Sequence, residues 1–138
     1  MKLVDKMLGE YGLREIPGVE NNPRIMEYFR WIGHSWVQDD EVAWCSAFLN
    51  WACLVTGLPR SGKLDARSWL SVGTPVYDPV LGDVVVLWRE SVASWKGHVG
   101  VFIRQTDDQI YLLGGNQNNE VCIKPYPGSR LLGYRRLV

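Results

Sequence analysis

Two residues of this 138-residue chain have the types and settings that nucleophilic catalysis needs, Cys45 and His98. Cys45 lies where a buried helix is predicted to begin. The unpaired backbone N–H groups and the dipole at the start of a helix lower the pKa of a thiol and so favour the thiolate. The same N–H groups can bind the oxyanion of a tetrahedral intermediate. His98 lies at the start of a predicted strand between Gly97 and Gly100, where an imidazole can act as the base for that thiolate. The alternatives are a cysteine that is only a small buried side chain and a histidine at a strand edge without a role.

A cysteine–histidine pair works better with a third polar group that fixes the imidazole. The run LGGNQNN, residues 113–119, ends the predicted strand that follows His98 by one hairpin. In an antiparallel pair, the end of one strand lies near the start of the other, so we expect Asn116 beside His98. A simple turn is the alternative, because Asn and Gly dominate turns, and the third group would then be sought at Gln117 or Asn118.

The elements that must position these residues divide into a helical first half and a strand-rich second half. Periodicity and capping residues predict helices over residues 2–11, 22–33, 44–57 and 65–70. From residue 82 onward, five short β-branched or aromatic runs indicate an antiparallel meander: GDVVVLWRE, HVGVFIRQ, QIYLLGG, EVCIKPY and LLGYRRL. This order predicts one α+β domain over residues 1–138, with the N-terminal helices packed on a C-terminal antiparallel five-stranded sheet.

Composition argues against several classes of protein. Fifteen Lys and Arg balance fifteen Asp and Glu, so a nucleic-acid partner is not expected. The chain has no apolar run of about 20 residues, so we expect no membrane insertion. The three cysteines do not suit a disulfide framework, and no CxxC or HxxxH spacing indicates a metal site. We expect a monomer that needs no metal ion or other cofactor. We also expect that the protein is made in the cytoplasm without a signal peptide.

Five motifs in this order resemble the papain-like NlpC and CHAP superfamily of cysteine peptidoglycan hydrolases, and especially a small subfamily found in phages and bacteria. They are EIPGVENNPRI at residues 15–25, WCSAFLNW at 44–51, GDVVVLW at 82–88, GHVG at 97–100 and GGNQ at 114–117. The resemblance implies a papain-like fold in which Cys45 is the nucleophile, His98 the general base and Asn116 the orienting residue. The third residue of NlpC proteins is often His, so an amide here is a departure that resembles papain.

The same resemblance suggests residues that contact substrate. Ser46 matches a serine that follows the nucleophile and lies near the substrate, and Gln38 is a candidate second oxyanion donor by analogy with papain's glutamine. Apart from the resemblance, Trp44 beside Cys45 and Trp95 in the loop before His98 can line a cleft, while most of the seven tryptophans are expected in the core. Gln117 is expected on the substrate side of the site.

The function implied is a cysteine amidohydrolase or endopeptidase that cleaves an amide bond of the peptidoglycan stem peptide through a thioester. Its expected site of action is the cell wall or periplasm, reached by release or by delivery through another system. A non-catalytic wall-binding module of the same fold and a papain-like hydrolase of proteins are the alternatives.

Overall fold

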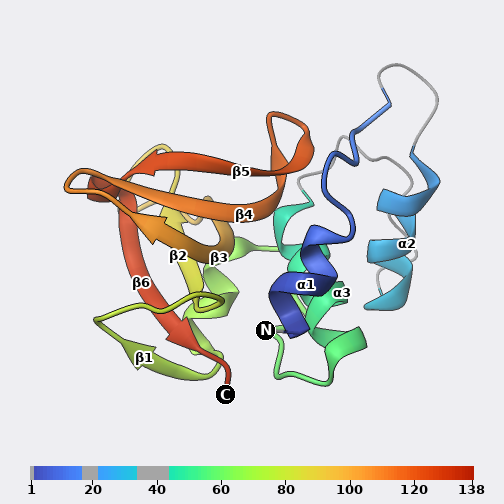
Figure 1. Ribbon diagram of the computed structural model, residues 1–138, viewed down its shortest axis with the longest axis horizontal. Helices are drawn as coiled ribbons and strands as arrows, with labels where there is room; N and C mark the ends of the chain where they lie inside the picture. The colour runs from blue at the N-terminus through green and yellow to red at the C-terminus, as the bar shows by residue number, and fades with distance from the viewer. Residues whose placement is uncertain (1, 17–21, 34–43) are drawn as a thin grey trace.

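The computed structural model describes residues 2–16, 22–33 and 44–138, and places helices before strands along the chain (Figure 1). The elements are α1 (Lys2–Leu8), α2 (Pro23–Trp31), α3 (Cys45–Thr56), the 3₁₀ helix η1 (Ala66–Ser71), β1 (Thr74–Val76), β2 (Val84–Trp88), β3 (Gly97–Gln105), β4 (Gln109–Gln117), β5 (Glu120–Pro127), the 3₁₀ helix η2 (Gly128–Arg130) and β6 (Leu131–Arg136). The α+β class and the antiparallel sheet are therefore confirmed.

The sheet has six strands, so the expected number of five was wrong.

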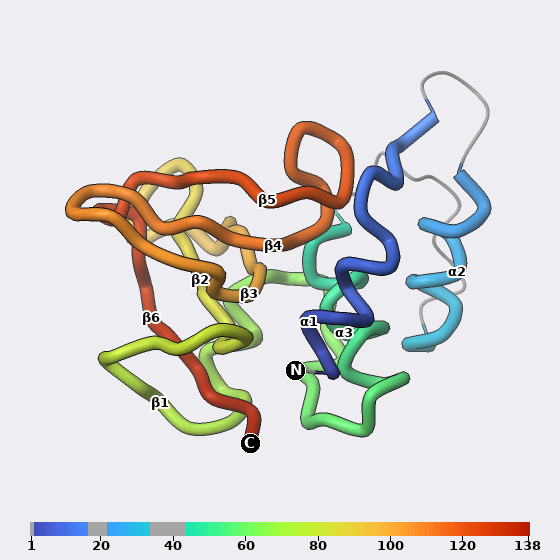
Figure 2. The backbone as a smooth tube through the Cα atoms, viewed as in Figure 1, coloured from blue at the N-terminus to red at the C-terminus, as the bar shows by residue number. Residues whose placement is uncertain are grey.

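The extra strand is β1, whose three residues are exposed or half-buried and include Pro75. Its sequence has no alternation of apolar and polar residues that would predict a strand. It pairs with β6, with Thr74 opposite Arg136. The strand order is β1-β6-β2-β3-β4-β5. A meander therefore holds from β2 to β5, but β6 pairs with β2 instead of β5. In Figure 2, the chain turns sharply after β5 and runs as β6 down past β2 towards β1, so that β6 joins the sheet beside β2, away from β5.

Helix ends follow the capping residues of the sequence. The Asn22 side chain accepts a hydrogen bond of 2.8 Å from the backbone N–H of Arg24, and Pro23 takes the first helical position of α2. Gly57 ends α3 in the left-handed region, with φ of 73°. The helix expected over residues 65–70 is the 3₁₀ helix η1, and its preceding residue Asp65 makes no side-chain capping bond.

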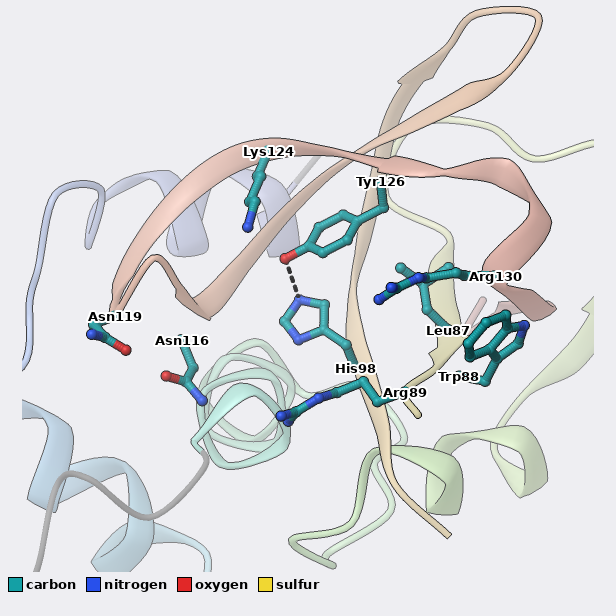
Figure 3. A pocket seen from close by; sticks show the side chains of 9 residues that line it. All are labelled: Leu87, Trp88, Arg89, His98, Asn116, Asn119, Lys124, Tyr126 and Arg130. Atoms are coloured by element: carbon teal, nitrogen blue, oxygen red, sulfur yellow. Dashed lines mark hydrogen bonds between the residues drawn. The ribbon is translucent and has the colours of Figure 1, made fainter. Parts of the chain in front are cut away.

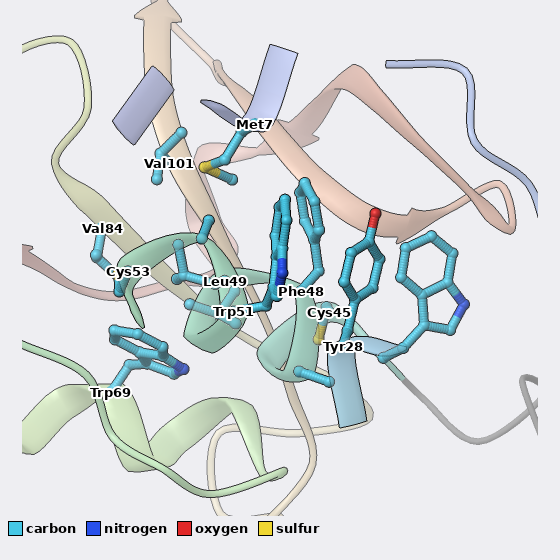
Figure 4. Packing of buried hydrophobic residues seen from close by; sticks show 14 of the residues in the cluster. Met7, Tyr28, Cys45, Phe48, Leu49, Trp51, Cys53, Trp69, Val84 and Val101 are labelled. Atoms are coloured by element: carbon cyan, nitrogen blue, oxygen red, sulfur yellow. The ribbon is translucent and has the colours of Figure 1, made fainter. Parts of the chain in front are cut away.

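Helix α3 contacts α1 and α2 as well as β3 and β4, and Figure 4 shows its buried side chains, among them Phe48, Leu49 and Trp51, packed in the core. Every residue from Cys45 to Cys53 is buried, which is the signature of a helix that is covered on all sides. One core cluster joins the three α-helices to the inner face of β2, β3 and β4, and a second covers the opposite face of the sheet. None of the helices in the three described ranges is long and apolar enough to cross a membrane.

Candidate active site

Cys45 is the first residue of α3, and Trp44 at the capping position gives the first turn no side-chain hydrogen bond. The Cys45 thiol is hydrogen-bonded to the His98 side chain and to the backbone of Ser46 and Val99. Burial by itself would raise the pKa of the Cys45 thiol, but the charge and hydrogen bond of His98, with the two backbone groups, outweigh it. The pKa of Cys45 is therefore below that of an ordinary thiol, and the site favours a thiolate.

His98 is brought to the thiol by a strand that packs closely against both neighbours. Its cross-strand partner is Leu87 on β2. A Cβ at Gly97 would lie 2.8 Å from the carbonyl oxygen of Leu87, and a Cβ at Gly100 would lie 2.9 Å from that of Leu113. Glycine is therefore required at positions 97 and 100 for steric reasons, because a side chain at either position would push β3 away from β2 or β4.

Gln117 fixes the orientation of the His98 ring. Its amide nitrogen donates to the backbone oxygens of Leu112 (3.1 Å) and Cys122 (2.7 Å), so its Oε1 must be the atom that faces His98 Nε2 at 2.9 Å. An amide oxygen only accepts hydrogen bonds, so His98 Nε2 carries a proton and donates it. The neutral ring then has its lone pair on Nδ1, the nitrogen left for Cys45. The buried Gln117 side chain thus selects the tautomer that a general base needs.

The position expected for Asn116 is therefore taken by Gln117. Regular alternation along β4 would put Asn116 on the same face as Ile110 and Leu112, which is the face of His98. The strand pairing is irregular between Gly114, which pairs with Cys122, and Gln117, which pairs with Glu120. Over this stretch β4 advances by three residues while β5 advances by two, so β4 contains one extra residue. Asn116 adopts a φ of 57° within it. One extra residue reverses the alternation, so Gln117 turns inward and Asn116 lies on the rim of the pocket.

Gly114 and Gly115, the two glycines before Asn116, leave space for neighbouring side chains, and neither has a positive φ. A Cβ at Gly114 would lie 2.9 Å from Oε1 of Gln117. A Cβ at Gly115 would lie 2.5 Å from the Trp44 ring and 3.0 Å from Cβ of Phe48. Gly114 therefore makes room for the amide that holds His98, and Gly115 lets the start of α3 approach β4.

The other residues expected to contact substrate are not brought together at His98. Trp44 is fully buried, and its Nε1 donates to Glu15 at 2.7 Å. Trp95 is 72% exposed in the loop before β3 and does not line the pocket at His98. Gln38 lies outside the described residues.

Ser46 is also fully buried, with its side chain turned away from the pocket at His98. The Ser46 hydroxyl donates to the Lys63 backbone oxygen at 2.6 Å and accepts from Trp69 Nε1 at 2.9 Å. Asn50 completes this network by binding the Ser46 backbone oxygen and the Gly62 N–H. Ser46 thus joins α3 to the following loop and to η1.

Ser46→Ala is expected to lower the free energy of unfolding by about 1–3 kcal/mol, because the buried Trp69 N–H loses its partner, while the Lys63 carbonyl still accepts a hydrogen bond from Asn50. Turnover per folded molecule should change little. Thermal unfolding and turnover measured on one sample test this. A normal melting temperature with a raised KM would instead show that Ser46 contacts substrate.

All three cysteines are free and buried, but they differ in acidity. Burial raises the pKa of Cys53 to about 12. Burial also raises the pKa of Cys122, partly offset by a hydrogen bond from Gln117. Cys45 alone among them has a lowered pKa. In the described ranges, no group of three His, Cys, Asp or Glu side chains is placed to hold a metal ion.

A pocket of about 270 Å³ lies over His98, and Figure 3 shows the side chains around it. It is lined by Leu87, Trp88, Arg89, His98, Asn116, Asn119, Lys124, Tyr126 and Arg130. The Tyr126 hydroxyl lies 3.2 Å from His98 Nε2. Sequence reasoning missed Tyr126 and the three cationic residues. The spacing of Lys124 and Tyr126 in β5, two residues apart and so on one face, is the signal that could have found them.

Comparison with known proteins places the fold. No family model matches the chain, and no curated protein matches it. Among solved structures, it is similar to a protein described as similar to lipoprotein, of the NLP/P60 family, from Staphylococcus aureus subsp. aureus Mu50, with a TM-score of 0.56 and 14% identity. The match covers 99% of this chain and 40% of that protein, so the chain spans less than half of its length. The chain has an NlpC/P60-like fold.

Proposed function

We propose that the protein is a cysteine amidohydrolase or endopeptidase that cleaves an amide bond in the peptide of peptidoglycan. One observation carries the proposal: a thiol of lowered pKa at the start of a helix, hydrogen-bonded to a histidine whose tautomer is held by a buried amide. The NlpC/P60-like fold supports wall peptide as the substrate. Fold alone does not decide function, so the chemistry of Cys45 and His98 is the main support.

The reaction divides into acylation and deacylation. The Cys45 thiolate attacks the carbonyl carbon, and backbone N–H groups at the start of α3 stabilise the oxyanion. His98, protonated on both nitrogens at this stage, gives the Nδ1 proton to the leaving nitrogen as the C–N bond breaks. A thioester and a free amine result. Nδ1 then takes one proton from water as the resulting hydroxide attacks the thioester. The C–S bond breaks and restores the thiolate beside a protonated His98, and the carboxylic acid product loses its remaining proton to solvent. Throughout, Gln117 holds the ring by its Nε2 hydrogen bond.

Wall peptide is found outside the cytoplasm, so we propose that the protein acts in the cell wall or periplasm after release or delivery by another system. Its partner is then the peptide of peptidoglycan. Nothing in the mechanism requires a metal ion or an organic cofactor.

Mass spectrometry of purified peptidoglycan after digestion tests the proposal. New fragments with a free L-alanine amine would identify an amidase, and fragments with a free amine inside the stem peptide would identify an endopeptidase. A wall-binding module would sediment with peptidoglycan and release no fragment. Cleavage of a protein substrate, with intact peptidoglycan, would favour the papain-like alternative.

The lowered pKa of Cys45 predicts a selective reaction with iodoacetamide. Because only the thiolate reacts, the rate at Cys45 should rise with pH to a half-maximum below the value of about 8.5 for a free thiol. Cys53, with a pKa of about 12, should stay unreactive over this range. Peptide mapping after timed alkylation at several pH values measures both rates. A half-maximum for Cys45 at or above that of free cysteine would contradict the assignment.

A further inference from the structure

The 3₁₀ helix η1 is anchored beside the start of α3. Its Trp69 side chain is fully buried, so packing holds η1 against the core. Trp69 Nε1 also donates a hydrogen bond of 2.9 Å to the hydroxyl of Ser46, the residue after the proposed nucleophile. Arg67, two residues earlier on η1, therefore has a fixed support.

Arg67 binds the loop over residues 89–96, which joins β2 to β3. Its Nε donates to the backbone oxygen of Lys96 at 2.9 Å. Its two terminal nitrogens donate to the backbone oxygens of Val92 at 2.7 Å and Ser91 at 2.9 Å. The guanidinium group is planar and its donors point in fixed directions, so binding three carbonyl oxygens fixes where they lie relative to η1.

Burial does not hold this loop in place. None of residues 89–96 is buried, and the apolar side chains of Val92 and Trp95 are exposed. The ion pair between Lys96 and Glu90 lies within the loop and is open to solvent, so it contributes little. The hydrogen bonds from Arg67 instead tie the loop to η1.

Arg67 also packs against Gly97, the residue before His98. A Cβ at Gly97 would lie 3.2 Å from Cγ of Arg67 and 3.4 Å from Cβ of Ala66. Successive residues of a strand face opposite sides, so η1 supports the start of β3 from behind while His98 faces the pocket. The support therefore reaches the residue next to the imidazole.

We propose that Arg67 is a positioning residue that holds His98 against Cys45, with η1 as its support. This rests on the proposed function, because it concerns the thiol and the imidazole used there. Arg67 does not line the pocket at His98, so it acts through Gly97 and the loop. Without its three hydrogen bonds the start of β3 is free to shift, and a displacement of about 1 Å at reacting groups costs about 100-fold in rate.

Arg67→Lys tests this role, because lysine keeps the charge and an aliphatic stem but has a single ammonium instead of the fork. We expect kcat for peptidoglycan to fall about 10- to 100-fold with little change in KM. The pH of half-maximal reaction of Cys45 with iodoacetamide should also rise. Contact with His98 lowers the pKa of Cys45 and burial raises it, so a weaker contact leaves the effect of burial less opposed.

Arg135→Lys is the matched control. Arg135 also binds backbone oxygens with its guanidinium group, those of Val72 at 2.8 Å and Gly73 at 2.9 Å. It pairs with Val84, at the other end of β2 from the strand partner of His98. This variant should lower the melting temperature as Arg67→Lys does, but it should keep both kcat and the half-maximal pH.

Arg67→Ala adds a chemical rescue. Free guanidinium at millimolar concentration can occupy the vacated position and reach the same three oxygens, so it should restore part of kcat and lower the half-maximal pH again. Arg135→Ala should show neither response. If Arg67→Ala does not fold, Arg67→Lys still decides the question.

An unchanged half-maximal pH in Arg67→Lys, or an equal rise in Arg135→Lys, would overturn the positioning role. Failure of the proposed function gives a different result. The wild-type protein would then release no fragment from peptidoglycan, while the half-maximal pH at Cys45 would still report whether Arg67 holds His98 against it.

Discussion

Cys45→Ala is expected to reduce hydrolysis of purified peptidoglycan by at least about 10⁴-fold, because it removes the thiolate that would form the thioester. Removing one buried sulfur should cost about 1 kcal/mol of stability, so the variant should remain folded. Turnover and melting temperature on the same preparation measure both effects. Cys53→Ala is the matched control: it removes a buried thiol from the same helix, whose raised pKa excludes it from the chemistry, and it should keep turnover.

His98→Ala should be nearly as damaging as Cys45→Ala, since the thiolate and the imidazole act as a unit. The double variant should then be little slower than either single one. Turnover that is retained by Cys45→Ala would show that the nucleophile lies elsewhere. Losses that multiply in the double variant would show that the two residues act independently.

Gln117→Ala is expected to lower kcat by about 10- to 1,000-fold with little change in KM, because the His98 ring loses the acceptor that selects its tautomer. The variant also removes the partner of two backbone oxygens, so about 1–3 kcal/mol of stability should be lost. Steady-state kinetics below the melting temperature separate the two effects, because a loss of stability alone leaves kcat per folded molecule unchanged.

Asn116→Gly is the matched control for Gln117, since glycine tolerates the φ of 57° at this position. If the amide of Gln117 orients His98, this variant should keep most of its kcat. A large fall in kcat for Asn116→Gly, with normal kcat for Gln117→Ala, would return the orienting role to Asn116.

The α+β outline of the fold could be predicted because it depends on local signals, whereas the catalytic pairing of Cys45 with His98 stays a prediction. The cap at Asn22, the stop at Gly57 and the β-branched runs each have a direct physical cause. Strand β1 was missed because three residues around a proline carry no periodic signal. The pairing of β6 with β2 was missed because it depends on how the sheet bends after β5.

The side chain beside His98 is Gln117, one residue after the expected Asn116, for a reason that composition hides. Asn and Gly in residues 113–119 indicate a turn but do not say where the extra residue of the irregularity falls. That single residue decides whether Asn116 or Gln117 faces His98. Ser46 was expected at the substrate from the family resemblance, and Trp44 because it lies beside Cys45. Helix α3 is covered on all sides, so both side chains are buried in the core. The cations of the pocket come from β5, the loop after β2 and η2, which only the folded chain brings together.

Partial alkylation of Cys45 tests the central claim most directly. The protein is treated with limiting iodoacetamide, and the fraction of Cys45 modified is compared with the remaining hydrolysis of purified peptidoglycan. If Cys45 is the nucleophile, the remaining activity equals the unmodified fraction at every point, down to none at full modification. Hydrolysis that persists after Cys45 is fully modified, or unmodified protein that releases no peptide fragment, would contradict the account.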